Sequence, residues 1–128
     1  MKALLDTHAF LWWNTDDPQL SQTAREFIGD GRNEIYLSAA SAWEIAIKYG
    51  KGRLQLPQPP DTYVAQRMVH HRFTSLPVAL SHALQVFTLP HIHQDPFDRL
   101  LVAQSSMENL PLLSADTEIH RYKVDVIW

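Results

Sequence analysis

The 128-residue sequence predicts a single α/β domain in which helices cover both faces of a mainly parallel sheet. Three observations lead to this fold class. Short apolar runs of strand length alternate with longer segments of helical pattern, which is typical of parallel sheets. The densest cluster of turn-forming residues, 54–60, is too short to separate two domains. A composition of 45% hydrophobic and 20% charged residues is that of a globular domain with a substantial core.

The first part of the chain supplies two expected strands with a helix between them. Residues 3–5 form an apolar run that ends at an acid, which predicts a short buried strand. A helix is expected over 22–28, because Ser21 is a favoured N-cap residue. The apolar run 34–37 predicts the second strand.

This second strand is expected to lead directly into a helix that ends near Tyr49. Ser38 follows the strand at once, and Ala39 and Ala40 are good helix formers. Gly50 is a natural end for this helix.

The proline-rich connection is followed by the order helix, strand, helix. A helix is expected over 61–71, a short strand over 73–77 and a second helix over 81–88. Pro90 closes the second helix, because proline cannot continue the helical hydrogen-bond pattern.

The last third of the chain begins with an expected helix over 95–108. Asp95 is a favoured N-cap, and Pro96 suits the first helical position. Strands are expected over 111–114 and 124–128. In an open parallel sheet built from these elements, ligands bind outside the carboxyl ends of the strands.

Four acids fall on four different elements of this fold: Asp6, Glu44, Asp98 and Asp116. Asp6 directly follows the first strand and Asp116 closely follows the strand 111–114, so the fold brings three or four acids to one edge. Two carboxylates about 4 Å apart repel by about 4 kcal/mol at an effective dielectric near 20. A divalent cation relieves this repulsion, and oxygen ligands alone suit Mg²⁺ or Mn²⁺ rather than zinc.

Each aspartate also has a purely structural explanation. Asp6 and Asp116 are favoured caps or turn formers at the ends of strands. Asp95 and Asp98 stabilise the start of a helix, where carboxylates are favoured by the helix dipole.

Glu44 has a structural explanation as well, in a capping box with Ser41. A helix that begins at Ser38 disfavours it, because Glu44 then lies nearly two turns inside the helix. The apolar stripe of this helix is expected at Trp43, Ala46 and Ile47. An acid that borders such a stripe costs free energy to desolvate unless it is paired or binds a metal.

The segments around these acids resemble the four motifs of PIN-domain ribonucleases, in the same order along the chain. They cover residues 2–8, 38–46, 95–104 and 113–116. The run Asp95-Pro96-Phe97-Asp98-Arg99 is the most specific part of the resemblance. The nearest subgroup is that of the VapC-like toxins of bacterial toxin–antitoxin pairs.

The resemblance implies a three-layer α/β/α PIN-like domain over residues 1–128 that hydrolyses RNA with Mg²⁺ or Mn²⁺. All four acids carry over from the family as catalytic residues. Asp6 and Asp98 would be the main metal ligands, and Asp116 would complete a second or outer position. Glu44 would ligate through water or orient the attacking water.

Three further residues would support this site. Thr7 and Ser114 match the small hydroxyl residues that the family places beside its first and fourth acids. Asp95 belongs to the subgroup's form of the third motif, as a helix cap first and a helper second. The candidate contacts to RNA phosphates, which a solvated helix end explains equally well, are Lys48, Lys51, Arg53 and Arg99.

Partners and location are also expected from these observations. The resemblance implies a cognate antitoxin and a homodimer, and the adjacent Trp12 and Trp13 fit an interface if one faces the core and the other is exposed. The seven histidines are expected at the surface, since a zinc site at His91 and His93 lacks a third ligand at standard spacing. No apolar run is long enough to span a membrane, and the absence of cysteine favours a cytoplasmic location.

Two other classes of function fit parts of the sequence. A catalytically inactive PIN-like partner-binding module stays open, because the sequence does not show that the four acids converge. A phosphoacceptor signalling domain needs a pair of acids after the first strand and a lysine after the fourth strand. This class is disfavoured, because the sequence has a lone Asp6 and no lysine near Asp116. The net charge of −3 gives no basic footprint for the whole domain, so contact with RNA needs a local patch.

Overall fold

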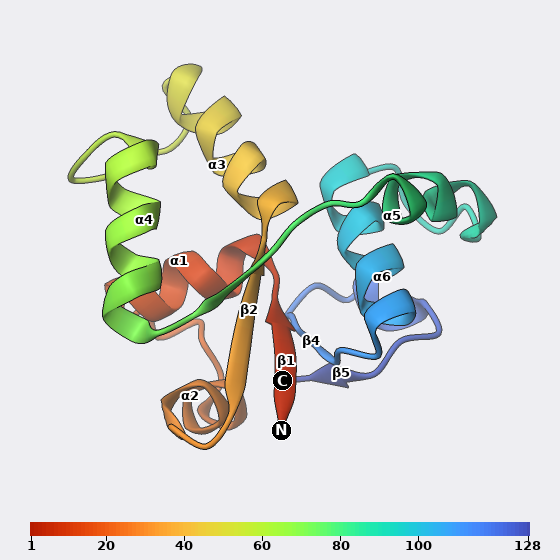
Figure 1. Ribbon diagram of the computed structural model, residues 1–128, viewed down its shortest axis with the longest axis horizontal. Helices are drawn as coiled ribbons and strands as arrows, with labels where there is room; N and C mark the ends of the chain where they lie inside the picture. The colour runs from red at the N-terminus through yellow and green to blue at the C-terminus, as the bar shows by residue number, and fades with distance from the viewer.

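The computed structural model describes all 128 residues, and its strands form one parallel sheet. The strands are β1 (Lys2–Leu5), β2 (Glu34–Ser38), β3 (Thr74–Leu76), β4 (Leu112–Leu113) and β5 (Val126–Ile127). Their order in the sheet is β3-β2-β1-β4-β5, and every neighbouring pair is parallel. The chain therefore builds the sheet outward from β1 in one direction, then returns to the other side of β1 with β4 (Figure 1).

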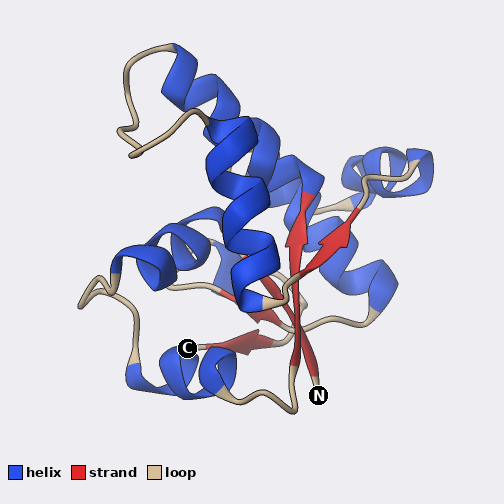
Figure 2. Ribbon diagram, turned by 60° about the vertical axis from the view of Figure 1, so that its left-hand side comes forward, coloured by secondary structure: helices blue, strands red, loops and turns tan.

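Helices cover both faces of this sheet, as the sequence predicts. The α-helices are α1 (Thr7–Thr15), α2 (Gln22–Gly29), α3 (Ala39–Gly50), α4 (Pro60–His71), α5 (Leu80–Gln85) and α6 (Pro96–Glu108). Two 3-10 turns, η1 (Val86–Thr88) and η2 (Ile119–Arg121), complete the elements. Helices α1, α2 and α4 lie on one side of the strands and α5 and α6 on the other (Figures 1 and 2), which confirms the three-layer α/β/α prediction. None of the helices combines the length and the hydropathy that crossing a bilayer requires.

The sheet separates two clusters of buried apolar side chains. Alternate residues of β1 point to opposite faces, so Ala3 and Leu5 join one cluster while Leu4 joins the other. Helix α3 reaches both clusters, with Ile45 in the first and Ala40 in the second. Because α3 is packed into both layers, its side chains have fixed positions relative to the end of β1.

Helix α1 is absent from the helices expected in the sequence, and its two tryptophans differ from expectation. Trp12 and Trp13 are both half-buried against the same apolar cluster, so the expectation that only one faces the core is wrong. The indole of Trp12 lies 6.0 Å from that of Trp128, and Trp13 lies edge-on to His71 at 5.7 Å. The end of the chain and α4 thus cover both rings.

Helix α3 begins as the sequence predicts but turns a different face inward. Ser38 is its N-cap, and the Ser38 hydroxyl accepts a hydrogen bond from Ala40 N–H at 3.0 Å. The expected apolar stripe is wrong, because Trp43 is 61% exposed and Ala46 is exposed as well. The face that packs inward consists of Ala40, Ser41, Glu44 and Ile45. Glu44 therefore lies within the buried face of α3 rather than at its border.

Candidate active site

The carboxyl ends of β1 and β4 meet at the point where the strand order reverses. Leu5 is paired with Leu113, and Asp6 N–H donates to the Leu113 carbonyl at 3.1 Å. Ser114 directly follows β4, and the Ser114 hydroxyl accepts a hydrogen bond from Asp116 N–H at 3.1 Å. In open α/β sheets this reversal point is where ligands bind. The structure thus brings Asp6 and the segment of Asp116 to the expected edge.

Asp6 is fixed at this edge by hydrogen bonds from both sides. It is the N-cap of α1, and its Oδ1 accepts from Ala9 N–H at 2.7 Å. Burial raises the pKa of Asp6, while hydrogen bonds from the Ser114 hydroxyl and from Ala9 N–H lower it. The charge of Asp116 raises the pKa of Asp6 further, which places these two carboxylates within electrostatic reach of each other.

Asp98 enters the same cluster from the first turn of α6. Asp95 caps this helix by accepting from the backbone N–H groups of Phe97 and Asp98 at 2.9 and 3.0 Å. Burial, followed by the charges of Asp95, Asp116 and Asp6, raises the pKa of Asp98 to about 8. Carboxylates from three elements therefore lie within electrostatic reach of one another and destabilise one another in the charged form.

The residues at this place fit a divalent cation. Ligand atoms of His93, Asp98 and Asp116 all lie within 4.8 Å of one another. Carboxylate oxygens are the preferred ligands of Mg²⁺ and are accepted by Mn²⁺. The mutual repulsion that raises the pKa of Asp98 is the repulsion that a bound cation offsets.

Glu44 is held near the end of β1 by hydrogen bonds from two side chains. The Thr7 hydroxyl donates to its Oε1 at 2.7 Å, and the Lys48 ammonium donates to its Oε2 at 2.5 Å. Glu44 is buried, whereas Lys48 is partly exposed. Since Thr7 directly follows Asp6, the Thr7 hydrogen bond ties Glu44 to the end of β1.

His93 belongs to this site, although the sequence suggests it only for a zinc site with His91 and otherwise predicts it at the surface. Its side chain is only 14% exposed, and its Nε2 lies 3.3 Å from Asp98 Oδ2. Its Nδ1 makes a 2.7 Å hydrogen bond with the Tyr122 hydroxyl. The expectation of surface histidines is wrong for His93 and also for the buried His82. The sequence signal that could have found His93 is its position two residues before Asp95, the N-cap of α6, because this places it near the first turn of α6 and therefore near Asp98.

A buried glutamine connects the elements that carry the candidate site. Gln104 of α6 is fully buried, and its Oε1 accepts from the Ser38 hydroxyl at 2.6 Å. Its Nε2 donates to the Pro77 carbonyl at 3.2 Å and lies 3.4 Å from His82 Nδ1. These contacts fasten the start of α3, which carries Glu44, to the helix that carries Asp98.

The four basic residues proposed as RNA contacts have different surroundings. Lys51 and Arg53 are exposed, and Lys48 is paired with Glu44. Arg99 is buried, and its guanidinium donates to the Pro90 carbonyl at 2.8 Å and the Tyr122 hydroxyl at 3.1 Å. The expectation that Arg99 contacts RNA is corrected, because its donors are directed at oxygens inside the protein.

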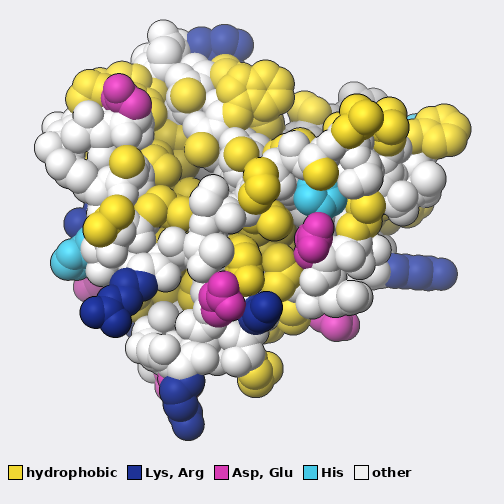
Figure 3. Space-filling model, in the orientation of Figure 1, with side chains coloured by type: hydrophobic (Ala, Val, Ile, Leu, Met, Phe, Trp, Pro, Cys, Tyr) yellow, Lys and Arg dark blue, Asp and Glu magenta, His cyan; other side chains and the backbone are white.

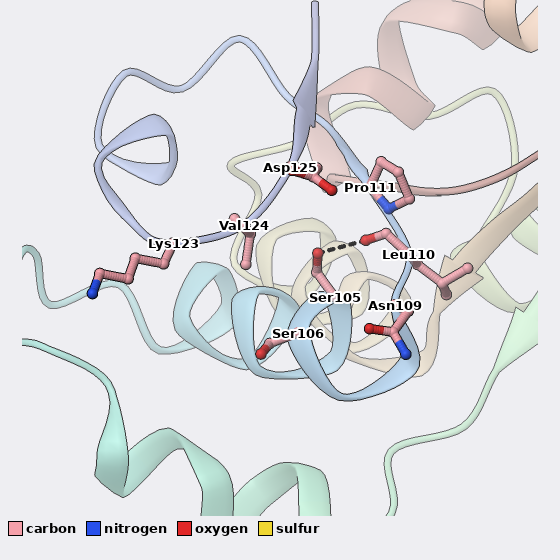
Figure 4. Close-up of a pocket in the computed structure, with 8 residues that line it drawn as sticks. All are labelled: Ser105, Ser106, Asn109, Leu110, Pro111, Lys123, Val124 and Asp125. Atoms are coloured by element: carbon pink, nitrogen blue, oxygen red, sulfur yellow. Dashed lines mark hydrogen bonds between the residues drawn. The ribbon is translucent and has the colours of Figure 1, made fainter.

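Two cavities of similar size lie at opposite edges of the sheet. One of about 420 Å³ adjoins the candidate site and is lined by Thr7, His8, Lys48 and Arg53 among others. The other, of about 410 Å³, lies before the start of β4 and β5, where Ser105 donates to the Leu110 carbonyl (Figure 4). Parallel strands place their amino ends away from the acid cluster, so this second cavity is separate from the candidate site.

Substitution of Asp95 separates its role as a cap from its charge. Asp95→Asn keeps a side-chain acceptor for the start of α6, so we expect the free energy of unfolding to change by less than about 0.5 kcal/mol. Asp95→Ala removes the acceptor and is expected to cost about 1 kcal/mol. Urea denaturation of the three proteins measures the difference. Equal losses in the two variants would contradict the capping role.

The pKa of Asp98 predicts how the stability of the metal-free chain depends on pH. Between its ordinary value of 3.8 and about 8, the folded chain keeps a proton that the unfolded chain has lost. The folded state binds more protons, so the free energy of unfolding is expected to decrease as pH rises, by at most about 1.4 kcal/mol per pH unit. Urea denaturation in EDTA at pH 5 and pH 8 measures this decrease. The same decrease in Asp98→Asn would assign it to another group.

Comparison with known proteins agrees with the fold. The PIN domain family matches residues 3–125, and the chain belongs to this family. Within it, the chain is similar to two curated proteins of Mycobacterium tuberculosis (strain ATCC 25618 / H37Rv). Ribonuclease VapC16 is 49% identical over 59 residues, which are 46% of this chain and 40% of that protein. Ribonuclease VapC22 is 28% identical over 121 residues, which are 94% of this chain and 91% of that protein.

Solved structures show the same fold at low sequence identity. The structure of VapBC2 from Rickettsia felis bound to a DNA fragment from its promoter has a chain with a TM-score of 0.71 and 14% identity. FitAcB from Neisseria gonorrhoeae has a chain with a TM-score of 0.62 and 19% identity. Each comparison covers 98% of this chain and 96% of the other. The resemblance seen in the sequence motifs is thereby confirmed at the level of the family and the fold.

Proposed function

We propose that this chain is a metal-dependent endoribonuclease that hydrolyses RNA phosphodiester bonds and serves as the toxin of a toxin–antitoxin pair. The observation that carries the proposal is the convergence of Asp6, Asp98 and Asp116 at the reversal point of a PIN-domain sheet. The names of VapC16 and VapC22 describe ribonucleases, and they support the reaction class. An RNA target would place its action in the cytoplasm.

Asp6, Asp98 and Asp116 are the residues that would hold Mg²⁺ or Mn²⁺. When bound, such an ion supplies neutralisation of charge on the phosphate and a lower pKa for water. The Ser114 hydroxyl keeps the Asp6 carboxylate turned toward the cluster, while the Asp95 cap fixes the turn that carries Asp98. The chain thus holds its three carboxylates in place before substrate arrives, which lowers the cost of organising the site.

Glu44 would orient the attacking water. Its carboxylate is held by Thr7 and Lys48 and keeps further lone pairs as acceptors. Thr7 sets the direction of Glu44 relative to Asp6.

The substrate would approach along the cavity beside Thr7 and Lys48. Arg53 lines this cavity and the exposed Lys51 lies two residues before it, so both can contact RNA phosphates. His8 and Trp12 also line it and stack on each other at 5.4 Å, and the exposed His8 ring can take an unpaired base. This local basic patch offsets the net negative charge of the chain.

Protein partners would cover the apolar surface of α3, α4 and α5. Figure 3 shows hydrophobic side chains gathered over these helices. The exposed ones are Trp43 of α3, Val69 of α4, Leu80 and Leu84 of α5, and Phe87 of the adjoining η1. Clustered exposed apolar side chains of this kind mark protein interfaces. A cognate antitoxin and a second copy of the chain are the partners that we propose for this surface and its margins.

Cleavage of total cellular RNA by the purified chain tests the proposed function. We expect discrete fragments with Mg²⁺ or Mn²⁺ and none with EDTA, and the fragment ends would identify the target. Binding of Mn²⁺ is measured in parallel by calorimetry. The absence of both cleavage and Mn²⁺ binding would contradict the proposal and would favour an inactive partner-binding module.

A further inference from the structure

We propose that His93 supplies a nitrogen ligand to the metal ion of this site, which biases the site toward Mn²⁺ over Mg²⁺. The inference rests on the proposed function, because it concerns the ion of the same site. It adds a residue that lies outside the four acids and outside the motifs that carry the resemblance.

The position of the imidazole carries the first step. His93 reaches the cluster from the segment before α6, and its Nε2 lies 3.3 Å from Asp98 Oδ2. Atoms that share one cation at about 2.1 Å are about 3.0 Å apart when adjacent and about 4.2 Å when opposite. The spread of up to 4.8 Å among His93, Asp98 and Asp116 needs only small side-chain rotations to reach such spacing.

The ring of His93 is held as a metal-bound imidazole is held in known sites. Ligating histidines usually donate their second ring N–H to an oxygen, which fixes both the tautomer and the direction of the ring. Here the second nitrogen, Nδ1, lies 2.7 Å from the Tyr122 oxygen. The Arg99 guanidinium donates to the same oxygen at 3.1 Å and thereby fixes Tyr122. With Nδ1–H donating to Tyr122, Nε2 presents its lone pair to the cluster.

A hydrogen bond to Asp98 is a weaker account of this contact. Hydrogen bonds between nitrogen and oxygen are usually about 2.7–3.2 Å long. The 3.3 Å between Nε2 and Asp98 Oδ2 exceeds this range, although both side chains are mostly buried and well fixed. Two ligands of one cation, which share the ion rather than a proton, are naturally spaced in this way.

The nitrogen donor has a chemical consequence for the choice of ion. Mg²⁺ strongly prefers oxygen ligands, whereas Mn²⁺, although it is the weakest binder of the divalent first-row transition metals, accepts a nitrogen ligand beside oxygen ligands. A site with His93 beside Asp98 and Asp116 would therefore bind Mn²⁺ more tightly than a site with oxygen ligands alone. Loss of His93 is expected to reduce the preference for Mn²⁺ over Mg²⁺ by about 10-fold or more, in the range seen when supporting groups of metal sites are removed.

Pulsed electron paramagnetic resonance of the Mn²⁺-loaded chain tests the ligand directly, without measuring activity. We expect ¹⁴N modulation from a coordinated imidazole in the unchanged chain and its replacement by ¹⁵N signals when the histidines are ¹⁵N-labelled. His93→Gln should lose the modulation. His91→Gln, which changes an exposed histidine two residues away, should keep it.

The outcomes separate this inference from the proposed function. Mn²⁺ binding and RNA cleavage without ¹⁴N modulation, or modulation that persists in His93→Gln, would overturn the role of His93 alone. Absence of both Mn²⁺ binding and cleavage in the unchanged chain would overturn the proposed function as well. Circular dichroism and thermal unfolding test whether His93→Gln is folded, and absence of ¹⁴N modulation in the unchanged chain overturns the role of His93 even if that variant is not. Competition between Mg²⁺ and Mn²⁺ by calorimetry supplies the second readout, and an unchanged preference in His93→Gln would also contradict the inference.

Discussion

Asp98→Asn is expected to reduce RNA cleavage by about 10³-fold or more while leaving the metal-free chain folded. The loss follows because an amide is a poor ligand for a hard cation, and the cation supplies several kcal/mol of transition-state stabilisation. The metal-free variant is also expected to be more stable than the unchanged chain, because it lacks a carboxylate that Asp95, Asp116 and Asp6 repel. Cleavage assays with Mn²⁺ and thermal unfolding in EDTA at pH 8 measure the two effects.

A matched control for this variant is Asp125→Asn. Asp125 is exposed and lines the cavity at the opposite edge of the sheet, so the same change of charge there should leave cleavage unaltered. If Asp98→Asn retains metal-dependent cleavage, the assignment of the acid cluster as the catalytic metal site is wrong. A melting temperature below that of the unchanged chain would contradict the mutual repulsion of the carboxylates.

Gln104→Leu is expected to lower the free energy of unfolding by about 3 kcal/mol. The variant leaves the buried Ser38 hydroxyl without its acceptor, which costs about 1–3 kcal/mol, and removes the part-buried hydrogen bond to the carbonyl of the exposed Pro77, which costs about 0.5–1.5 kcal/mol. For a chain of 128 residues this corresponds to a fall in melting temperature of about 11 °C. Differential scanning calorimetry measures both quantities.

Gln66→Leu is the control for this second variant, because Gln66 is an exposed glutamine within α4. Its effect should stay within about 0.5 kcal/mol. Ser38→Ala combined with Gln104→Leu should cost less than the sum of the two single changes, since both remove the same hydrogen bond. A loss below about 1 kcal/mol in Gln104→Leu would show that the network contributes little to the contact between α3 and α6.

The parts of the fold that could be predicted from sequence are those set by local chemistry. Ser21, Ser38 and Asp95 each accept hydrogen bonds from the first turn of a helix, and all three helices begin where these caps predict. The alternation of strands and helices predicts the parallel sheet in the same way, because parallel strands need crossover helices.

The parts that could not be predicted depend on contacts between distant elements. The buried face of α3 is displaced from the expected stripe because Glu44 is stabilised by Thr7 and Lys48, whereas Trp43 packs against Phe97 at the surface. Arg99 follows Asp98 in sequence but points into the protein, because helical neighbours are about 100° apart.

Much of the candidate site could likewise be predicted from the positions of its acids. Asp6 and Asp116 follow strands that proved to be neighbours, so the rule for open sheets was sufficient for them. The catalytic roles of the four acids remain predictions. The position of His93 in this site could not be predicted, because it depends on the path of the segment before α6. Arg99 and Tyr122 fix that path, and no local sequence pattern does.

The order of the strands has a consequence for the synthesis of the chain. Strand β4 lies beside β1, although Leu113 and its paired partner Leu5 are separated by most of the sequence. At about 5–20 residues per second, the ribosome makes Asp116 roughly 5–22 s after Asp6. The nascent chain therefore cannot assemble the carboxylate cluster until Asp116 has been translated. A nuclease built in this way has no complete acid cluster while the ribosome is still making β1, β2 and β3.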